Sequence, residues 1–194
     1  FNLGPDTYTV NVIDTNSCST DSAYSITEPD SLHIVPSITS DYNGQDISCF
    51  NASDGSVLVS TTGGTTPYTF LWSNGSTDST ANGLVEGTYI ITVTDANGCV
   101  KVDSISLTQP TQLIIEDSIS PVLCFGDSIG AIDITVSGAT PGYAYSWSNG
   151  SVNQDLSGLI TGNYIVTVTD TNNCQEISTL NVTQPSAPLS LSED

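Results

Sequence analysis

The five cysteines are the residues whose spacing most clearly suggests chemistry. Cys49 and Cys99 lie 50 residues apart, and so do Cys124 and Cys174. The neighbouring pairs Cys18–Cys49 and Cys99–Cys124 have unequal separations of 31 and 25 residues. The constant spacing predicts two disulfides, Cys49–Cys99 and Cys124–Cys174, with the partner of Cys18 expected upstream of this sequence. Closing a 50-residue loop adds roughly 4 kcal/mol in the loop-entropy model, and disulfides imply an oxidising, extracellular setting.

Metal binding is the alternative role for these cysteines and for two aspartates. Cys-x-x-Cys spacing is absent and His33 is the only histidine, which disfavours a transition-metal site. Asp95 and Asp170 open the turn sequences D-A-N and D-T-N, whose side-chain oxygens could join a calcium site. A turn capped by the Asp side chain is the favoured interpretation, because no loop is dense in oxygen ligands. We therefore expect no cofactor and keep Asp95 and Asp170 as the calcium candidates.

The sequence offers no catalytic residues. His33 lies in S-L-H-I-V-P, on an expected strand, without a matched nucleophile. The aspartates lie mainly in turns and do not form a repeated carboxylate pair. Trp72 and Trp147 could be sugar-binding platforms, but their place on the third expected strand of each unit favours a core position. The prediction is a protein that is not an enzyme.

Much of the sequence consists of an internal repeat. Residues 49–110 align with residues 124–185 without a gap, and about four in ten aligned positions are identical. Tyr8, Tyr89 and Tyr164 each stand ten residues before a cysteine, and we expect them, with the two tryptophans, to be core aromatics. A fixed period of this kind indicates an array of similar domains. The expected domains are the C-terminal half of a repeat (1–29), two complete repeats (30–110 and 111–185) and the start of another (186–194).

Composition and patterning predict strands in place of helices. There is one Lys, no Arg and no Met, whereas Val, Ile, Thr and Tyr are frequent. Alternating segments such as 130–138 and 162–170 read as strands, with 112–116 as the opening strand. The L-x-x-G-x-Y pattern before Tyr89 and Tyr164 is typical of the tyrosine corner of immunoglobulin-like sandwiches. We expect an all-β chain of tandem immunoglobulin-like β-sandwich repeats, about 75–81 residues each.

The formal net charge of −20 excludes several partners. A basic patch for nucleic acid cannot be built from a single Lys, and anionic membrane surfaces are disfavoured for the same reason. No segment has the length and apolarity of a membrane-spanning helix, so no direct membrane insertion is expected. The chain begins without Met and shows no signal peptide, so we expect it to be a piece of a longer or processed protein.

Taken together, several motifs resemble one known family. They are C-F-G-D-S-I-G-x-I, W-S-N-G, L-x-x-G-x-Y-x-V-T-V-T-D-x-N-x-C and the closing T-Q-P. This set resembles the SprB-type repeat of large cell-surface adhesins of gliding and marine Bacteroidota, over essentially the whole chain. The resemblance implies export by the type IX secretion pathway and a role in surface adhesion or gliding motility.

The same resemblance draws attention to Asp-Ser followed by a small or apolar residue, the O-glycosylation motif of these bacteria. It occurs with Ser22, Ser31, Ser79, Ser104, Ser118 and Ser128. Common turn chemistry is the competing explanation.

The sequence therefore predicts the stalk or adhesive repeat array of a secreted or cell-surface adhesin. Its expected partners are neighbouring repeats of the same chain and a surface polysaccharide. The alternative is an accessory carbohydrate- or calcium-binding module of an exported multidomain enzyme.

Overall fold

The chain is built from β-strands. The computed structural model describes residues 2–190, and within them there are fourteen strands and no helix. The strands are β1 (Asp6–Ile13), β2 (Ser19–Ile26), β3 (His33–Ile38), β4 (Gly55–Thr62), β5 (Thr69–Trp72), β6 (Thr80–Leu84), β7 (Gly87–Thr94), β8 (Val100–Leu107), β9 (Ile114–Ser120), β10 (Gly130–Ser137), β11 (Ala144–Trp147), β12 (Leu156–Leu159), β13 (Gly162–Thr169) and β14 (Gln175–Val182). The expected all-β class is confirmed.

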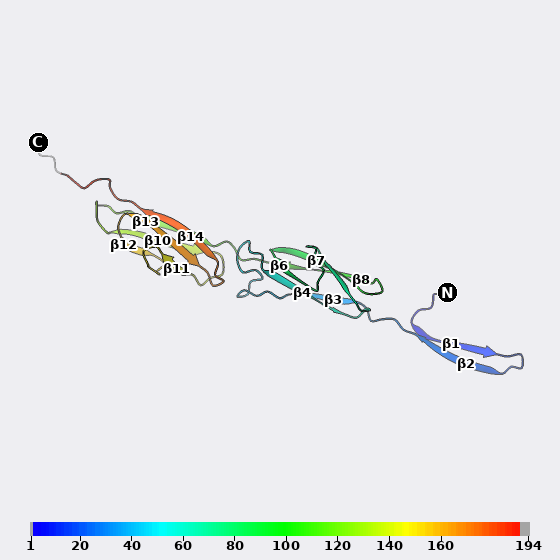
Figure 1. Ribbon diagram of the computed structural model, residues 1–194. Helices are drawn as coiled ribbons and strands as arrows, with labels where there is room; N and C mark the ends of the chain where they lie inside the picture. Colours follow the sequence, from blue (N-terminus) through cyan, green and yellow to red (C-terminus); the bar gives the residue numbers. More distant parts are fainter. Residues whose placement is uncertain (1, 191–194) are drawn as a thin grey trace. The chain divides into compact units, whose positions relative to one another are not determined.

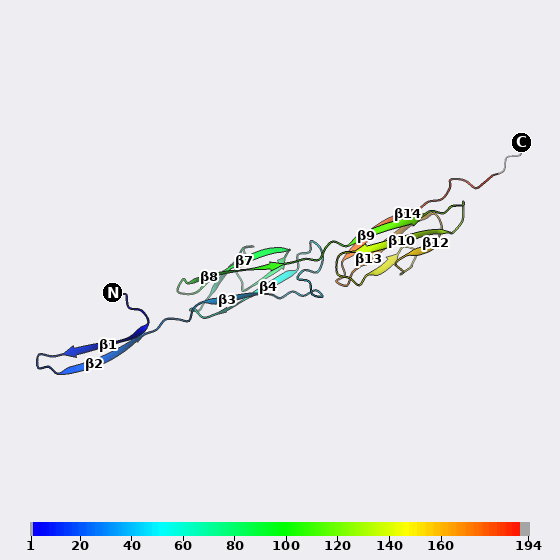
Figure 2. The ribbon, with the colours of Figure 1, turned by 180° about the vertical axis from the view of Figure 1, so that it is seen from behind.

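Strands β9 to β14 form one β-sandwich (Figures 1 and 2). One sheet has the order β12-β10-β9 and the other has the order β11-β13-β14, with every pairing antiparallel. In immunoglobulin notation these are strands E, B and A in one sheet and C, F and G in the other. The strand order confirms the expected immunoglobulin-like fold.

The core of this sandwich comes from alternate residues of the central strands. Ile132 and Ile134 of β10 are buried, as are Val166 and Val168 of β13. Successive side chains of a strand point to opposite faces, so this alternation gives each sheet one apolar face. Trp147, at the end of β11, belongs to the same buried cluster.

The earlier strands repeat this order. The sheets are β6-β4-β3 and β5-β7-β8. Two compact units are distinguished in the chain: one holds the described residues up to Pro36 with Val59–Ser79 and Ile90–Ser104, and the other holds Ser37–Leu58, Thr80–Tyr89 and the described residues from Ile105 onward. The expected domain boundaries are defined by the sequence repeat and stay predictions, and residues 191–194 of the expected fourth repeat lie outside the described residues.

Strands β1 and β2 pair as a hairpin over eight residues each, with Asp6 opposite Ile26 and Ile13 opposite Ser19. Its sequence matches the β7–β8 and β13–β14 hairpins, but all of its residues are exposed except the half-buried Tyr8. No helix within residues 2–190 is long and apolar enough to cross a membrane.

In three places a tyrosine at the start of a hairpin donates a hydrogen bond to the backbone four residues upstream. The hydroxyl of Tyr8 donates to the carbonyl of Gly4 at 2.9 Å. Tyr89 donates to Val85 at 3.0 Å and Tyr164 donates to Ile160 at 3.1 Å, in each case four residues upstream. This is the backbone contact of a tyrosine corner. All three tyrosines are half-buried, and Tyr164 packs against the buried core of its sandwich. The β1–β2 hairpin has no buried residue, so Tyr8 has no core around it in the described residues.

Candidate functional site: a disulfide-linked joint between repeats

Each hairpin tip carries the sequence D-x-N-x-C, which builds a rigid turn around its aspartate. In the last hairpin, Asp170 Oδ1 accepts the backbone N–H groups of Asn172 and Cys174, both at 2.8 Å, and Oδ2 accepts the N–H of Thr140 at 3.0 Å. The residue before the cysteine has a positive φ, 66° at Asn173. Asn tolerates this left-handed conformation, which lets a three-residue hairpin loop close.

The middle hairpin has the same geometry. Asp95 Oδ1 accepts the N–H groups of Asn97 and Cys99 at 2.9 and 2.8 Å, and Oδ2 accepts that of Thr65 at 2.9 Å. The bond from Thr65 is the largest cause of a lowered Asp95 pKa, and with the other backbone bonds it outweighs the opposing effect of desolvation.

These contacts argue against the calcium hypothesis for Asp95 and Asp170. Both oxygens of each carboxylate already face N–H dipoles, whose positive ends oppose a cation. Among residues 2–190 there is no cluster of three or more His, Cys, Asp or Glu side chains that could hold a metal ion. The two aspartates are 6% and 4% exposed and organise the hairpin tips.

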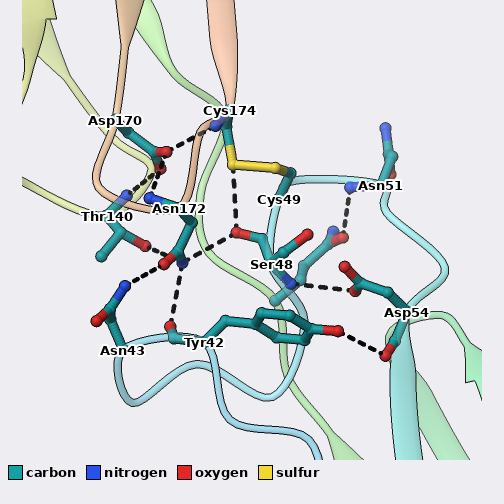
Figure 3. The surroundings of a disulfide bond; sticks show 11 residues. Tyr42, Asn43, Ser48, Cys49, Asn51, Asp54, Thr140, Asp170, Asn172 and Cys174 are labelled. Carbon is teal, nitrogen blue, oxygen red and sulfur yellow. Dashed lines mark hydrogen bonds between the residues drawn. A yellow bond between two sulfur atoms is a disulfide. The ribbon is translucent and has the colours of Figure 1, made fainter.

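A disulfide joins the last hairpin to the preceding repeat (Figure 3). Cys49, between β3 and β4, is bonded to Cys174, between β13 and β14, with a Cα–Cα distance of 5.7 Å. We call the contacts around this bond the joint; it comprises residues 42–51, 109–113, 139–140 and 170–176. The bond closes a loop of 125 residues, for which the loop-entropy model gives roughly 5 kcal/mol.

Asn172 connects the hairpin tip to the loop that carries Cys49. Its Nδ2 lies 3.1 Å from the carbonyl oxygen of Tyr42, 3.2 Å from that of Ser48 and 2.9 Å from Thr140 Oγ1. Its Oδ1 accepts a hydrogen bond from the side chain of Asn43 (Figure 3). One amide therefore contacts both sequence repeats, so it fixes their register at the joint.

Tyr42 and Asn43 belong to a tight turn. Tyr42 and Gln45 exchange two backbone hydrogen bonds, and Asn43 and Gly44 have φ values of 54° and 85°. Asn-Gly is the preferred pair for such a two-residue turn. The turn lies in the segment that is six residues longer before Cys49 than before Cys124. Burial is the largest cause of a raised Tyr42 pKa, and the nearby Asp54 adds to it.

The connecting segment T-Q-P-T-Q is also held at both ends. Gln109 Oε1 accepts the backbone N–H of Asn51 at 2.7 Å, and the carbonyl of Thr111 accepts the N–H of Ala139 at 2.9 Å. Pro110, between them, is buried. Thr108, Thr111 and Gln112 are exposed. The proline ring and the hydrogen bonds at both ends are properties of an ordered linker.

The expected pairings Cys49–Cys99 and Cys124–Cys174 are wrong. In the last repeat, Val122 donates its N–H to Thr183, so Cys124 lies near the end of β14, whereas Cys174 directly precedes the start of that strand. Eight residues of strand span about 23 Å, and a disulfide requires Cα atoms within about 7 Å. Cys18, Cys99 and Cys124 are free and exposed.

The tryptophans, His33 and the candidate glycosylation serines differ in how far they are exposed to solvent. Trp72 and Trp147 are 1% and 4% exposed, and each indole N–H donates to a backbone carbonyl, of Asp78 and of Asn153 respectively. Neither ring is available as a flat sugar-binding surface. His33 is exposed on β3. The candidate glycosylation sites Ser22, Ser31, Ser104, Ser118 and Ser128 are exposed, and Ser79 is half-buried.

Comparison with solved structures finds immunoglobulin-domain and surface proteins at low similarity. The N-terminal eight Ig domains of Down Syndrome Cell Adhesion Molecule isoform 1.30.30 match with 12% identity and a TM-score of 0.44, over 93% of this chain and 28% of that one. The C-terminal 282-residue fragment of intimin, solved with the intimin-binding domain of the translocated intimin receptor, matches with 12% identity and a TM-score of 0.36, over 91% and 57%. This chain thus spans less than a third of the first fragment, and TM-scores this low carry no functional conclusion.

A search of curated proteins returns no match. A family model described as the SprB repeat matches twice, at residues 42–77 and 117–152. The matches are 75 residues apart, like the internal repeat, and each contains the cysteine of the β3–β4 or β9–β10 connection and the core tryptophan. This chain therefore contains two segments that match the SprB repeat, at the spacing of its internal repeat.

Proposed function

We propose that this array is a tension-resistant stalk in an adhesin on the cell surface. The observation that carries the proposal is the Cys49–Cys174 bond, which ties one repeat to the next outside the main-chain connection. A force that separates the two repeats is then resisted by a covalent bond as well as by the linker. A spacer benefits from such a bond, whereas an independent binding module does not require it.

The hydrogen-bonded linker, with its buried proline, supports the same function. Gln109 is hydrogen-bonded to Asn51 of the preceding repeat, Thr111 is hydrogen-bonded to Ala139 of the last repeat, and Pro110 is buried. An array with joints of this kind keeps its length under thermal bending better than one with free Gly/Ser linkers. Its high negative charge would keep neighbouring stalks apart and soluble.

An extracellular location follows from the disulfide within the same proposal, because such bonds persist in oxidising compartments. A single Lys leaves trypsin-like proteases one cleavage site, which suits exposure outside the cell. Export by the type IX pathway and participation in gliding or attachment belong to this proposal through the SprB resemblance.

Surface polysaccharide and O-linked glycans are the further partners in this proposal. Five of the six Asp-Ser motifs present the serine to solvent, as a glycosyltransferase requires. The intact mass of native material tests the O-glycosylation. A mass above that of the unmodified chain is expected, and a mass equal to that of the unmodified chain would contradict glycosylation.

Small-angle scattering tests the stalk directly. The chain should give a radius of gyration well above about 16 Å, the value for one globule of 194 residues. Addition of calcium should change neither the profile nor the melting temperature. A compact particle, or a calcium-dependent rise in melting temperature, would contradict the stalk and favour an accessory binding module.

A further inference from the structure

The hairpin that carries Cys174 forms one wall of a groove that the preceding repeat borders. Six of its lining residues come from the last repeat: Gln112, Leu113, Ala139, Cys174, Gln175 and Glu176. Cys49 and Phe50 of the preceding repeat complete the lining, and the remaining space is about 250 Å³. The loop that begins at Cys49 therefore lies in a groove at the hairpin end of the last repeat.

The middle repeat has the same groove without such a loop. Its lining includes Ser31, Leu32, Gly64, Cys99, Val100 and Lys101, and its volume is about 370 Å³. In the repeat alignment these are the counterparts, position by position, of the six residues that line the first groove. The Cys99 thiol is free and exposed at its edge.

The hairpin beside this second groove already has the bonded conformation. Asp95 accepts the same three backbone N–H groups as Asp170, and Asn97 Nδ2 donates to Thr65 Oγ1 at 2.9 Å, as Asn172 does to Thr140. Asn97 is exposed, whereas Asn172 is half-buried under the preceding repeat. This end is therefore arranged for a loop like that of Cys49.

The complementary loop is present at the other end of the chain. Cys124-Phe125-Gly126 corresponds to Cys49-Phe50-Asn51, and Gly126 and Asn51 both have positive φ, 84° and 60°. Gln184 Oε1 accepts the N–H of Gly126 at 3.1 Å, as Gln109 accepts that of Asn51. Leu123 and Phe125 are 72% and 46% exposed, and the loop lines an apolar groove of about 530 Å³.

We propose that the groove at Cys99 and the loop at Cys124 are the two halves of a further joint, each of which binds another copy of this repeat in tandem. The loop cysteine of one copy pairs with the hairpin cysteine of the following copy. Two thiols form one disulfide, and a small-molecule disulfide accepts the two electrons and two protons and leaves as two thiols. The proposal deepens the stalk function, because every cysteine of the array then belongs to a joint between repeats.

The new joint should have fewer polar contacts than the joint at Cys49. Residues 117–123 lack the Asn-Gly turn, so the hairpin asparagine would lose its partners at Tyr42 and Asn43. The carbonyl of Leu123 replaces that of Ser48. The disulfide at Cys124 should therefore carry more of the stability of its joint.

The test is a chain in which residues 111–185 occur twice in succession. Its two added cysteines raise the number from five to seven. After refolding with a glutathione redox buffer and alkylation, we expect two disulfides: Cys49–Cys174, and Cys124 bonded to the hairpin cysteine of the added copy. Three thiols should remain free, at Cys18, Cys99 and the loop of the added copy. In the matched variant Cys124→Ser, four thiols should remain free.

An alkylated Cys124 in the extended chain would overturn the proposal, as would a Cys124–Cys174 bond. The Cys49–Cys174 bond in the same sample shows that the repeats have folded and docked. The stalk function is tested separately by scattering of the unextended chain, so the two can fail independently.

Discussion

Cys49 and Cys174 are bonded although 125 residues separate them. Each has another cysteine in its own repeat, Cys99 for Cys49 and Cys124 for Cys174, to which it is not bonded. The bond joins the β3–β4 connection of one repeat to the β13–β14 hairpin of the next. Each complete repeat thus supplies a loop cysteine at one end and a hairpin cysteine at the other. The two cysteines of one repeat cannot meet, because a full strand lies between them.

The single lysine makes this pairing easy to test. Lys101 divides the chain so that Cys49 lies in one tryptic fragment and Cys174 in the other. After the free thiols are blocked and the chain is denatured without reductant, trypsin should leave the fragments linked, and reductant should separate them. Fragments that separate without reductant would support pairing within each repeat and would contradict the joint.

Asn172 should contribute more to stability than its counterpart Asn97. Substitution of Asn172 by Ala removes the bonds to Tyr42 and Ser48 and leaves the half-buried carbonyl of Ser48 without its amide donor, whereas that of Tyr42 keeps the N–H of Gln45; the cost should be about 1–3 kcal/mol. Asn97→Ala removes the exposed bond to Thr65 and should cost about 1 kcal/mol or less. Urea unfolding of both variants compares them; equal losses would show that the contacts at the joint add no stability.

Asp95 should make stability depend on acid pH. Its pKa is lowered in the folded chain, so its contribution is present above the ordinary carboxyl pKa of 3.8 and is lost as pH falls through the folded pKa. Asp95→Asn should lower stability at pH 7 and make little difference near pH 2. Asp133→Asn, on the exposed face of β10, is the control. A pH-independent loss for Asp95→Asn would indicate that its charge has no role.

Gly138 should be intolerant of a side chain for a reason beyond its backbone conformation. Its φ is 83°, and a Cβ atom there would overlap the carbonyl oxygen of Gln112 in the linker. Gly150 has a similar φ of 86° and open space around it. Gly138→Ala should therefore destabilise the chain by at least about 2 kcal/mol more than Gly150→Ala, measured by thermal unfolding. Equal effects would mean that the linker is not fixed at Ala139 and Gln112.

Much of the fold could be predicted because strand periodicity and turn residues are local signals. The strands at 130–138 and 162–170 were expected close to their observed bounds, whereas the opening strand begins at Ile114 and not at residue 112. Strand β12 is only four residues long and contains Gly158 with a φ of 68°, so it has no clear alternation of apolar residues.

The cysteine pairing could not be derived from constant spacing. In a periodic array, a bond within each repeat and a bond from each repeat to the next both give a constant separation, here 50 or 125 residues. The choice depends on which end of the sandwich each cysteine occupies, and only the strand topology reveals that. Asn172 was missed for a related reason: its hairpin position was recognised as a turn, but its partners Tyr42 and Ser48 are more than 120 residues away.

Stretching single molecules by their two ends tests the joint most directly. While the Cys49–Cys174 bond is intact, the residues between the two cysteines cannot be extended, even after unfolding. Reduction under load should release one increment of about 440 Å, the contour length of 125 residues at about 3.5 Å each. Two increments of about 175 Å, as expected for two loops of 50 residues, would contradict the joint between repeats, as would no increment at all.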